Sequence, residues 1–176
     1  MSRMMKGSLM ANSQDDGPDY KLLKSDPHRF LALVQEHVRQ RPSDPIGYFR
    51  RHHAWESVGR RDLALKDLDH CLSLEPDWIT FLARGRLLRD MGRYRDAIAD
   101  FDRAEAANPE SWPTALGPLY RADCHARLGN ETAALADCAL LPDDHWTPGV
   151  FGTPAGDKQQ VTTKIRDIAR QQHGAR

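Results

Sequence analysis

Three pairs of neighbouring residues in this sequence have side chains that could bind a metal ion: His52 with His53, His70 with Cys71, and Cys124 with His125. Imidazole nitrogens and thiolate sulfurs are the usual ligands of zinc in proteins. Consecutive residues on a helix, however, point about 100° apart. We therefore expect no pair to form a chelating face, and the sequence predicts neither a metal site nor a cofactor.

A second group of reactive side chains is Asp143, Asp144 and His145, which could supply a carboxylate and a base for hydrolysis. No nucleophile motif, glycine-rich phosphate loop or HExxH motif accompanies them. We expect these residues to make turn and cap contacts, so the protein is predicted not to be an enzyme. A hydrolase built on residues 143–157 is the less favoured alternative.

The overall charge excludes two classes of partner. The 176 residues include 25 basic and 25 acidic side chains, so the long-range field that attracts nucleic acid or anionic lipid is missing. No apolar run is long enough for a signal peptide or a membrane span. The three cysteines form no CxxC pair, which suits a reducing compartment. We expect a cytoplasmic protein that binds neither nucleic acid nor membrane.

The elements that position these residues follow from an internal repeat. Shifts of 33 and 37 residues relate Gly59, Gly92 and Gly129. The same shifts relate three further sets, which are Ala64, Ala97 and Ala134; Leu68, Phe101 and Cys138; and Trp55, Leu88 and His125. Self-similarity at this period is typical of a solenoid, in which each unit buries its apolar face against its neighbours.

Each repeat is predicted to be a pair of helices. Tyr94, Ala97, Phe101 and Ala104 are spaced three and four residues apart, which is the period of a helix with one buried face. The glycine before them allows the left-handed conformation that ends the preceding helix. The repeat therefore predicts a series of helical hairpins.

Two charged positions recur with the same shifts. They are Arg51, Arg84 and Arg121, and Asp67, Asp100 and Asp137. A ladder of arginines alone could bind an anionic ligand. Because the aspartates stay in register with the arginines, pairing between the two helices of each hairpin is favoured, and we exclude these arginines from the binding site.

At this point the pattern resembles the tetratricopeptide repeat, whose small, aromatic, Ala, Phe and Pro positions recur about every 34 residues. The middle unit carries the fullest match, with Gly85, Gly92, Tyr94, Ala97, Phe101, Ala104 and Pro109. The first unit has His52 at a small-residue position, and the third has four additional residues and no final proline. The resemblance implies an all-α, right-handed solenoid of helical hairpins closed by a C-terminal capping helix.

The domain organisation follows from these patterns. Residues 1–24 are predicted to be disordered or mobile, and residues 25–141 to form the repeat domain. That domain comprises a single helix over 27–40 and repeats at about 45–76, 78–109 and 114–141.

Residues 142–176 are predicted to form a Pro/Gly-rich loop and a capping helix packed on the repeats. Asp157 and Gln160 suggest a capping box at the start of that helix. Trp146 and Phe151 are expected to pack beneath the helix, with a role as partner anchors as the alternative.

The resemblance implies a concave groove, lined by the first helix of each repeat, that binds a peptide or a partner helix. By family geometry its positions are Ile46, Phe49, His53, Glu56, Ile79, Leu82, Arg86, Arg89, Leu119, Asp123 and Arg127. Phe49 and Leu82 would contact apolar side chains, and Arg86 and Arg89 would pair with carboxylates. Packing between helices is the alternative for Ile46, Phe49, Leu82 and Leu119.

This groove suits another protein or peptide that is acidic and has apolar anchors. The family's clamp for chaperone C-termini needs Lys and Asn where this chain has Phe49 and His53, so we do not expect chaperone-tail binding. The predicted function is a non-catalytic adaptor or chaperone-like binder. The alternative is a structural or self-assembling subunit of a complex.

Overall fold

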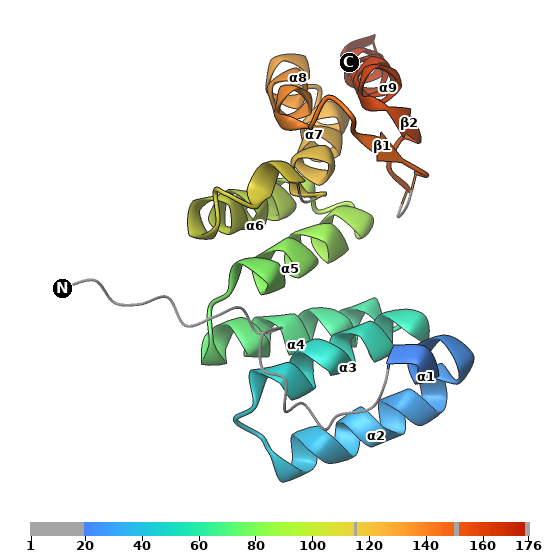
Figure 1. The fold of residues 1–176 in the computed structure, drawn as a ribbon, viewed down its shortest axis with the longest axis vertical. Coiled ribbons are helices and arrows are strands. Elements are labelled where there is room, and N and C mark those ends of the chain that lie inside the picture. The colour runs from blue at the N-terminus through green and yellow to red at the C-terminus, as the bar shows by residue number, and fades with distance from the viewer. Residues whose placement is uncertain (1–19, 115, 150–151, 175–176) are drawn as a thin grey trace, which may run out of the picture. The chain divides into compact units, whose positions relative to one another are not determined.

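The computed structural model describes residues 20–114, 116–149 and 152–174. The fold is all-α, as predicted, and consists of successive helical hairpins of the tetratricopeptide type (Figure 1). The chain divides into two compact units, Met1–Ala83 and Arg84–Arg176, and the boundary falls inside helix α5 (Trp78–Asp90). Among the described residues, no helix is long and apolar enough to cross a membrane.

The first unit contains α1 (Tyr20–Ser25), α2 (Pro27–Gln40), α3 (Pro45–Ser57), α4 (Arg61–Leu74) and the start of α5. Asp26 and Asp44 cap α2 and α3, because their carboxylates accept hydrogen bonds from the backbone N–H groups of Arg29 and Ile46. Proline follows each cap at the first helical position, where no N–H donor is needed. These two signals fix where α2 and α3 begin.

The N-terminal prediction differs from the structure over a few residues. Residues 20–25 form helix α1, although the sequence suggested an irregular segment through residue 24. Leu22 and Leu23 of this helix pack against the core of the first unit, whose buried residues are Phe30, Leu31, Val34 and Ala54. That packing outweighs the weak helix tendency of a short segment. Residues 1–19 lie outside the described residues.

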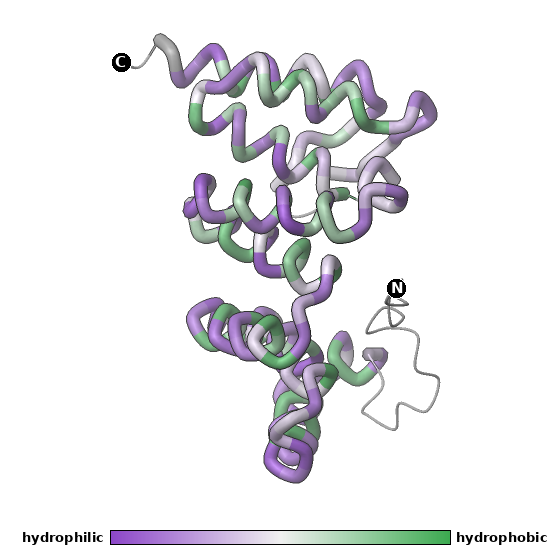
Figure 2. The backbone as a smooth tube through the Cα atoms, turned by 90° about the vertical axis from the view of Figure 1, so that its left-hand side faces the viewer, coloured by the Kyte–Doolittle hydropathy of each residue, from purple (hydrophilic) through white to green (hydrophobic). Residues whose placement is uncertain are grey.

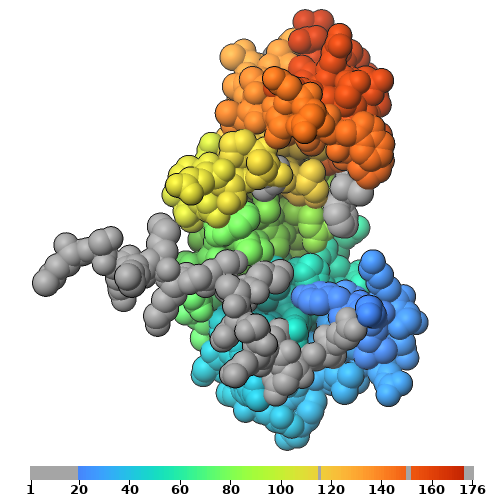
Figure 3. All heavy atoms as spheres, in the orientation of Figure 1, coloured from blue at the N-terminus to red at the C-terminus, as the bar shows by residue number. Residues whose placement is uncertain are grey.

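The second unit contains the end of α5 and the elements α6 (Tyr94–Ala107), η1 (Trp112–Thr114), α7 (Gly117–Arg127), α8 (Glu131–Leu140), β1 (Trp146–Thr147), β2 (Gly156–Asp157) and α9 (Lys158–Gly174). Within this unit α9 packs against α7 and α8 (Figure 3). Val161, Ile165 and Ala169 are fully buried in that contact. Figure 2 shows green apolar and purple polar stretches alternating along these helices, as expected for helices with one buried side.

The capping box predicted for the last helix is present. The N–H of Asp157 donates to Oε1 of Gln160 at 3.1 Å, and the N–H of Gln160 donates to Oδ1 of Asp157 at 2.9 Å. The two residues therefore satisfy each other's backbone donors at the start of α9.

The glycines between the paired helices take the predicted left-handed conformation. Gly59, Gly92 and Gly129 have φ angles of 77°, 76° and 79°. After each glycine, the next N–H donates back to a carbonyl near the helix end, on Trp55, Leu88 and His125, at 2.7, 2.9 and 2.9 Å. This is the same helix-ending motif three times, and it explains why the glycines recur in register.

Trp146 does not pack beneath the capping helix as predicted. It lies on β1, pairs with Asp157 on β2, and is 68% exposed. Successive side chains of a strand point to opposite faces, and here Thr147 takes the buried side at 1% exposure. The predicted position of Phe151 falls outside the described residues.

Trp112 is a core residue that the repeat pattern did not identify. It lies in the additional residues before the third hairpin and is 1% exposed. Gly117 is required beside it, because a Cβ atom there would collide with the indole ring. The guanidinium of Arg121 covers the ring at 5.0 Å from its centre. The additional residues thus supply a large side chain that fills space beside α7.

Candidate functional site

The recurring arginines and aspartates form one pair in each hairpin, which confirms the pairing predicted from their register. Arg51 donates two hydrogen bonds to Asp67, at 2.8 and 2.6 Å, and Arg84 donates two to Asp100, both at 2.7 Å. The third pair, Arg121 with Asp137, is 2.7 Å long at its shortest. The three aspartate side chains are at most 6% exposed. These arginines hold the hairpins together and are not available to a ligand.

In the first unit, the predicted groove positions differ in burial. Ile46, His53 and Glu56 on α3 are half-buried, as are Ile79 and Leu82 on α5. Phe49 is 6% exposed, and its ring packs edge-on against the rings of His52 and His53 at 4.7 and 5.4 Å between centres. The packing alternative therefore holds for Phe49.

In the second unit, four predicted groove residues belong to one charged cluster. We call it the arginine–aspartate cluster, and its members are Arg86, Arg89, Asp90, Asp123 and Arg127. Leu119, by contrast, is fully buried in the core between α7, α8 and α9, so it packs between helices.

Arg89 is not the exposed carboxylate-binding residue that its spacing suggested. It is 5% exposed, its Nη2 donates to Asp90 at 2.6 Å, and its guanidinium covers the ring of Tyr120 at 4.6 Å from the centre. Asp123 is also buried, at 1%, and accepts from Nε of Arg127 at 3.0 Å. Replacing Arg89 would remove positive charge beside the buried Asp123 and the half-buried Asp90 and should destabilise the fold.

The cluster consists of three arginines and two aspartates that pair with one another. Arg127 is the most accessible of the three arginines, with 38% of its side chain exposed, against 12% for Arg86 and 3% for Arg89. Its guanidinium also lies 5.7 Å from the ring centre of Tyr94. Arg127 is therefore the member of the cluster that is most open to solvent.

The three cysteines behave as core residues rather than as ligands or nucleophiles. All are buried free thiols. Burial raises the pKa of the Cys71 and Cys138 thiols to about 11 and that of Cys124 to about 12, so the reactive thiolate is scarce at neutral pH. The neighbour of Cys71, His70, is exposed and packs against the ring of Tyr48.

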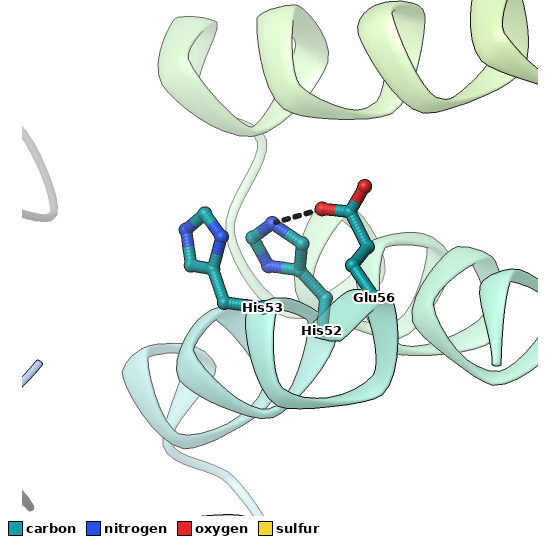
Figure 4. Close-up of side chains that lie close together, drawn as sticks. All are labelled: His52, His53 and Glu56. Carbon is teal, nitrogen blue, oxygen red and sulfur yellow. Dashed lines mark ion pairs between the residues drawn. The ribbon is translucent and has the colours of Figure 1, made fainter. Parts of the chain in front are cut away.

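One of the rejected pairs does converge. The ligand atoms of His52, His53 and Glu56 all lie within 4.8 Å of one another (Figure 4). The two imidazole rings are 3.8 Å apart at their centres, although the residues are consecutive on α3. The expectation that adjacent histidines must diverge is therefore wrong for this pair, because side-chain torsions turn both rings to the same side.

The residues of the hypothetical hydrolase are engaged in local contacts. Asp143 is exposed and accepts from Nζ of Lys158 at 2.9 Å. Burial lowers the pKa of the His145 imidazole, with Asp144 opposing that effect. The N–H of His145 donates to the carbonyl of Pro142 at 3.0 Å, which is a turn contact of the predicted kind, whereas the Asp143 pair reaches a residue fifteen positions away.

No protein-family model matches the chain. The chain is 33% identical to "DnaJ homolog subfamily C member 3" of Rattus norvegicus over 113 aligned residues. The aligned region covers 61% of this chain and 22% of that protein. It is also 30% identical to "Tetratricopeptide repeat protein 28" of Homo sapiens over 98 aligned residues. This aligned region covers 55% of this chain and 4% of that protein. The chain thus spans less than a quarter of these relatives.

Two solved structures have a similar fold. "Crystal structure of MamA" matches with a TM-score of 0.67 and 16% identity, over 89% of this chain and 90% of that chain. "MamA RS-1 ArsTM double mutant" matches with a TM-score of 0.63 and 19% identity, over 87% and 90%. At this identity the similarity shows the fold alone. Together with the repeat register and the named relative, it identifies the chain as a helical repeat protein of the tetratricopeptide type.

Proposed function

We propose that the chain is a non-catalytic adaptor or chaperone-like binder that holds an acidic segment of another protein. At the family level, the fold and the relatives support a protein-interaction module. Such folds generally serve as scaffolds for protein partners rather than as catalysts. A cytoplasmic location remains part of this proposal.

The observation that carries the proposal is the partly exposed guanidinium of Arg127 in the arginine–aspartate cluster. Its side chain is 38% exposed, while the side chain of the aspartate it pairs with, Asp123, is 2% exposed. Because Arg127 is the accessible member, it makes the first contact with a carboxylate, while Arg86 contributes at shorter range.

The first unit, taken by itself, also has predicted positions for contact with apolar side chains of a partner. Ile46 on α3 and Ile79 and Leu82 on α5 remain half-buried, so part of each side chain is still open to contact. Burying such partly exposed apolar area contributes about 25 cal/mol for each Å² removed from water. His53 and Glu56 complete the predicted positions on α3.

Affinity capture with the purified chain tests the proposal. Proteins retained by the wild type are compared with those retained by Arg127→Gln and by the control Arg95→Gln, which removes an exposed arginine of α6. Because Arg127 also pairs with the buried Asp123, circular dichroism must first show that Arg127→Gln keeps the helical content of the wild type. We then expect a partner rich in Asp and Glu to be retained by the wild type and the control and lost from Arg127→Gln. Retention of the same proteins by all three would contradict the proposed role of the cluster.

A second candidate role, assembly into a complex, is favoured by one observation. Trp146 is 68% exposed and Leu140 is 40% exposed, both in the second unit. Large apolar side chains at a surface are often interface anchors. If assembly is the role, light scattering will show a concentration-dependent oligomer that Trp146→Ser abolishes and Arg127→Gln leaves intact.

A further inference from the structure

We propose that His52, His53 and Glu56 form a binding site for a divalent transition-metal ion of the zinc class. The three side chains belong to one helix, α3, and lie entirely within the first unit (Figure 4). The site shares His53 and Glu56 with the predicted partner-binding positions, but its test measures metal binding by the chain alone.

The backbone of α3 accounts for part of the convergence. Glu56 follows His52 by four residues and His53 by three, and both spacings place side chains on one face of a helix. Nε2 of His52 lies 3.8 Å from Oε2 of Glu56. Glu56 therefore faces both histidines from the next turn of the helix.

Aromatic neighbours hold the imidazole rings in place. The Phe49 ring packs edge-on against both histidines. The ring of Tyr20 packs edge-on against His53 at 5.6 Å and an interplanar angle of 79°. His52 is fully buried, whereas His53 and Glu56 are half-buried. Two of the three ligands are thus restrained before an ion arrives, and the ion enters beside His53 and Glu56.

The distances fit a small tetrahedral ion after modest movement. Zinc ligands at about 2.0–2.1 Å from the metal lie about 3.3 Å from one another. Since the ligand atoms here are within 4.8 Å, the largest gap must close by about 1.5 Å. The half-buried Glu56 has three side-chain torsions and can shorten its own distances to the two imidazoles, while the spacing between the imidazoles changes by ring rotation.

The donor set selects the class of ion. Imidazole nitrogen binds zinc, copper, nickel and iron, whereas magnesium and calcium require a shell of oxygens. Two neutral imidazoles and one carboxylate leave a fourth position for water, as in open zinc sites. The charge of nearby Arg51 is compensated by its two hydrogen bonds to Asp67, so it does not oppose a cation strongly.

Zinc titration of the metal-free chain tests the site. Calorimetry and competition with a chromogenic chelator should show one equivalent bound with a Kd of about 1–10 µM at pH 7.5. His53→Ala and Glu56→Gln should each weaken binding at least about tenfold. The control His28→Ala removes an exposed histidine of α2 and should leave the Kd unchanged.

Two further readouts separate loss of a ligand from loss of the fold. Circular dichroism should show the same helical content in all variants, since neither His53 nor Glu56 is fully buried. Cobalt should give the intense visible absorption of a tetrahedral complex with the wild type and the His28→Ala control, but not with His53→Ala. Zinc affinity should fall on acidification, because the imidazoles must be neutral to bind.

Two results would overturn the site. The first is a wild-type Kd weaker than about 1 mM. The second is equal zinc binding by the wild type, His53→Ala and Glu56→Gln, which would mean an adventitious ion only. Neither result bears on partner capture by Arg127, so the two proposals fail separately.

Discussion

His125 is the residue whose environment most directly couples folding to pH. It is half-buried on α7, with Nε2 4.0 Å from Oδ2 of Asp137. Burial lowers the pKa of this imidazole; Asp137 opposes the effect and Arg121 adds to it. The unfolded chain, in which His125 is solvated, therefore accepts a proton at a higher pH than the folded chain does.

Stability should consequently fall with acidification in a window set by this histidine. Below about pH 6.5 the unfolded state binds more protons than the native state, so the free energy of unfolding decreases as the pH drops toward 5. His125→Asn should flatten part of that decrease in thermal unfolding followed by circular dichroism. His145, whose pKa is also lowered, accounts for some of the remainder.

The matched control for this prediction is His28→Asn, a change at an exposed position of α2. It should leave the slope of melting temperature against pH as in the wild type. An unaltered slope in His125→Asn would show that the burial of this imidazole has no thermodynamic consequence.

At the residue scale, sequence patterns predicted which side chains form ion pairs better than they predicted how exposed each side chain is. The Arg51–Asp67 pair and its two counterparts were predictable because opposite charges recur in register. The burial of Arg89 and the convergence of His52 with His53 were not, because both depend on side-chain torsions and on neighbouring rings. Helical spacing gives the direction of the Cα–Cβ bond but not the position of a long side chain's end.

At the element scale, the paired helices of each hairpin accommodate one another by size. In the second hairpin, Gly85 leaves room for Phe101, and a Cβ atom at Gly85 would lie 2.6 Å from Cε1 of that ring. The corresponding positions of the first hairpin carry His52 and Leu68, so a larger residue on the first helix is matched by a smaller one than Phe101 on the second. A histidine at a small-residue position is thus compatible with the repeat.

This complementarity predicts non-additive mutations. Gly85→Ala should be destabilising by about 1–3 kcal/mol through overpacking against Phe101. In a Phe101→Leu background, Gly85→Ala should lower the free energy of unfolding by less, because the phenylalanine ring is absent and alanine favours a helix. Urea unfolding of the four proteins should therefore give a coupling of at least about 1 kcal/mol.

Gly92→Ala combined with Phe101→Leu provides the control cycle. Gly92 has a φ of +76°, and no heavy atom lies within 4 Å of a Cβ built there, so its cost is backbone strain alone. The free-energy costs of Gly92→Ala and Phe101→Leu should therefore be additive. Additive costs in the Gly85 cycle as well would contradict the size argument.

The sequence predicted regular elements well and irregular ones poorly. The glycines that end the first helix of each pair and the capping box at Asp157 follow from local chemistry, and both are present. The short helix α1 and the β1–β2 ribbon were missed, because elements of two to six residues depend on tertiary packing rather than on their own periodicity.

At the scale of the whole molecule, repetition explains the fold more fully than the function. The fold follows from the register of the repeats and is shared with MamA at 16% identity. The division into a repeat domain over 25–141 and a cap over 142–176 stays a prediction, as do the individual groove residues. The proposed partner chemistry rests on a few partly exposed side chains, such as Arg127, that the repeat pattern does not constrain.

The most direct test of this account is the affinity of the chain for the captured partner segment, measured by fluorescence anisotropy at low and moderate salt. Arg127→Gln should weaken binding about tenfold and reduce its salt dependence, because an exposed contact to a carboxylate is lost. The control Arg95→Gln should stay within about twofold of the wild type. Equal affinities and equal salt dependence for the three proteins would contradict the claim that the arginine–aspartate cluster receives an acidic partner.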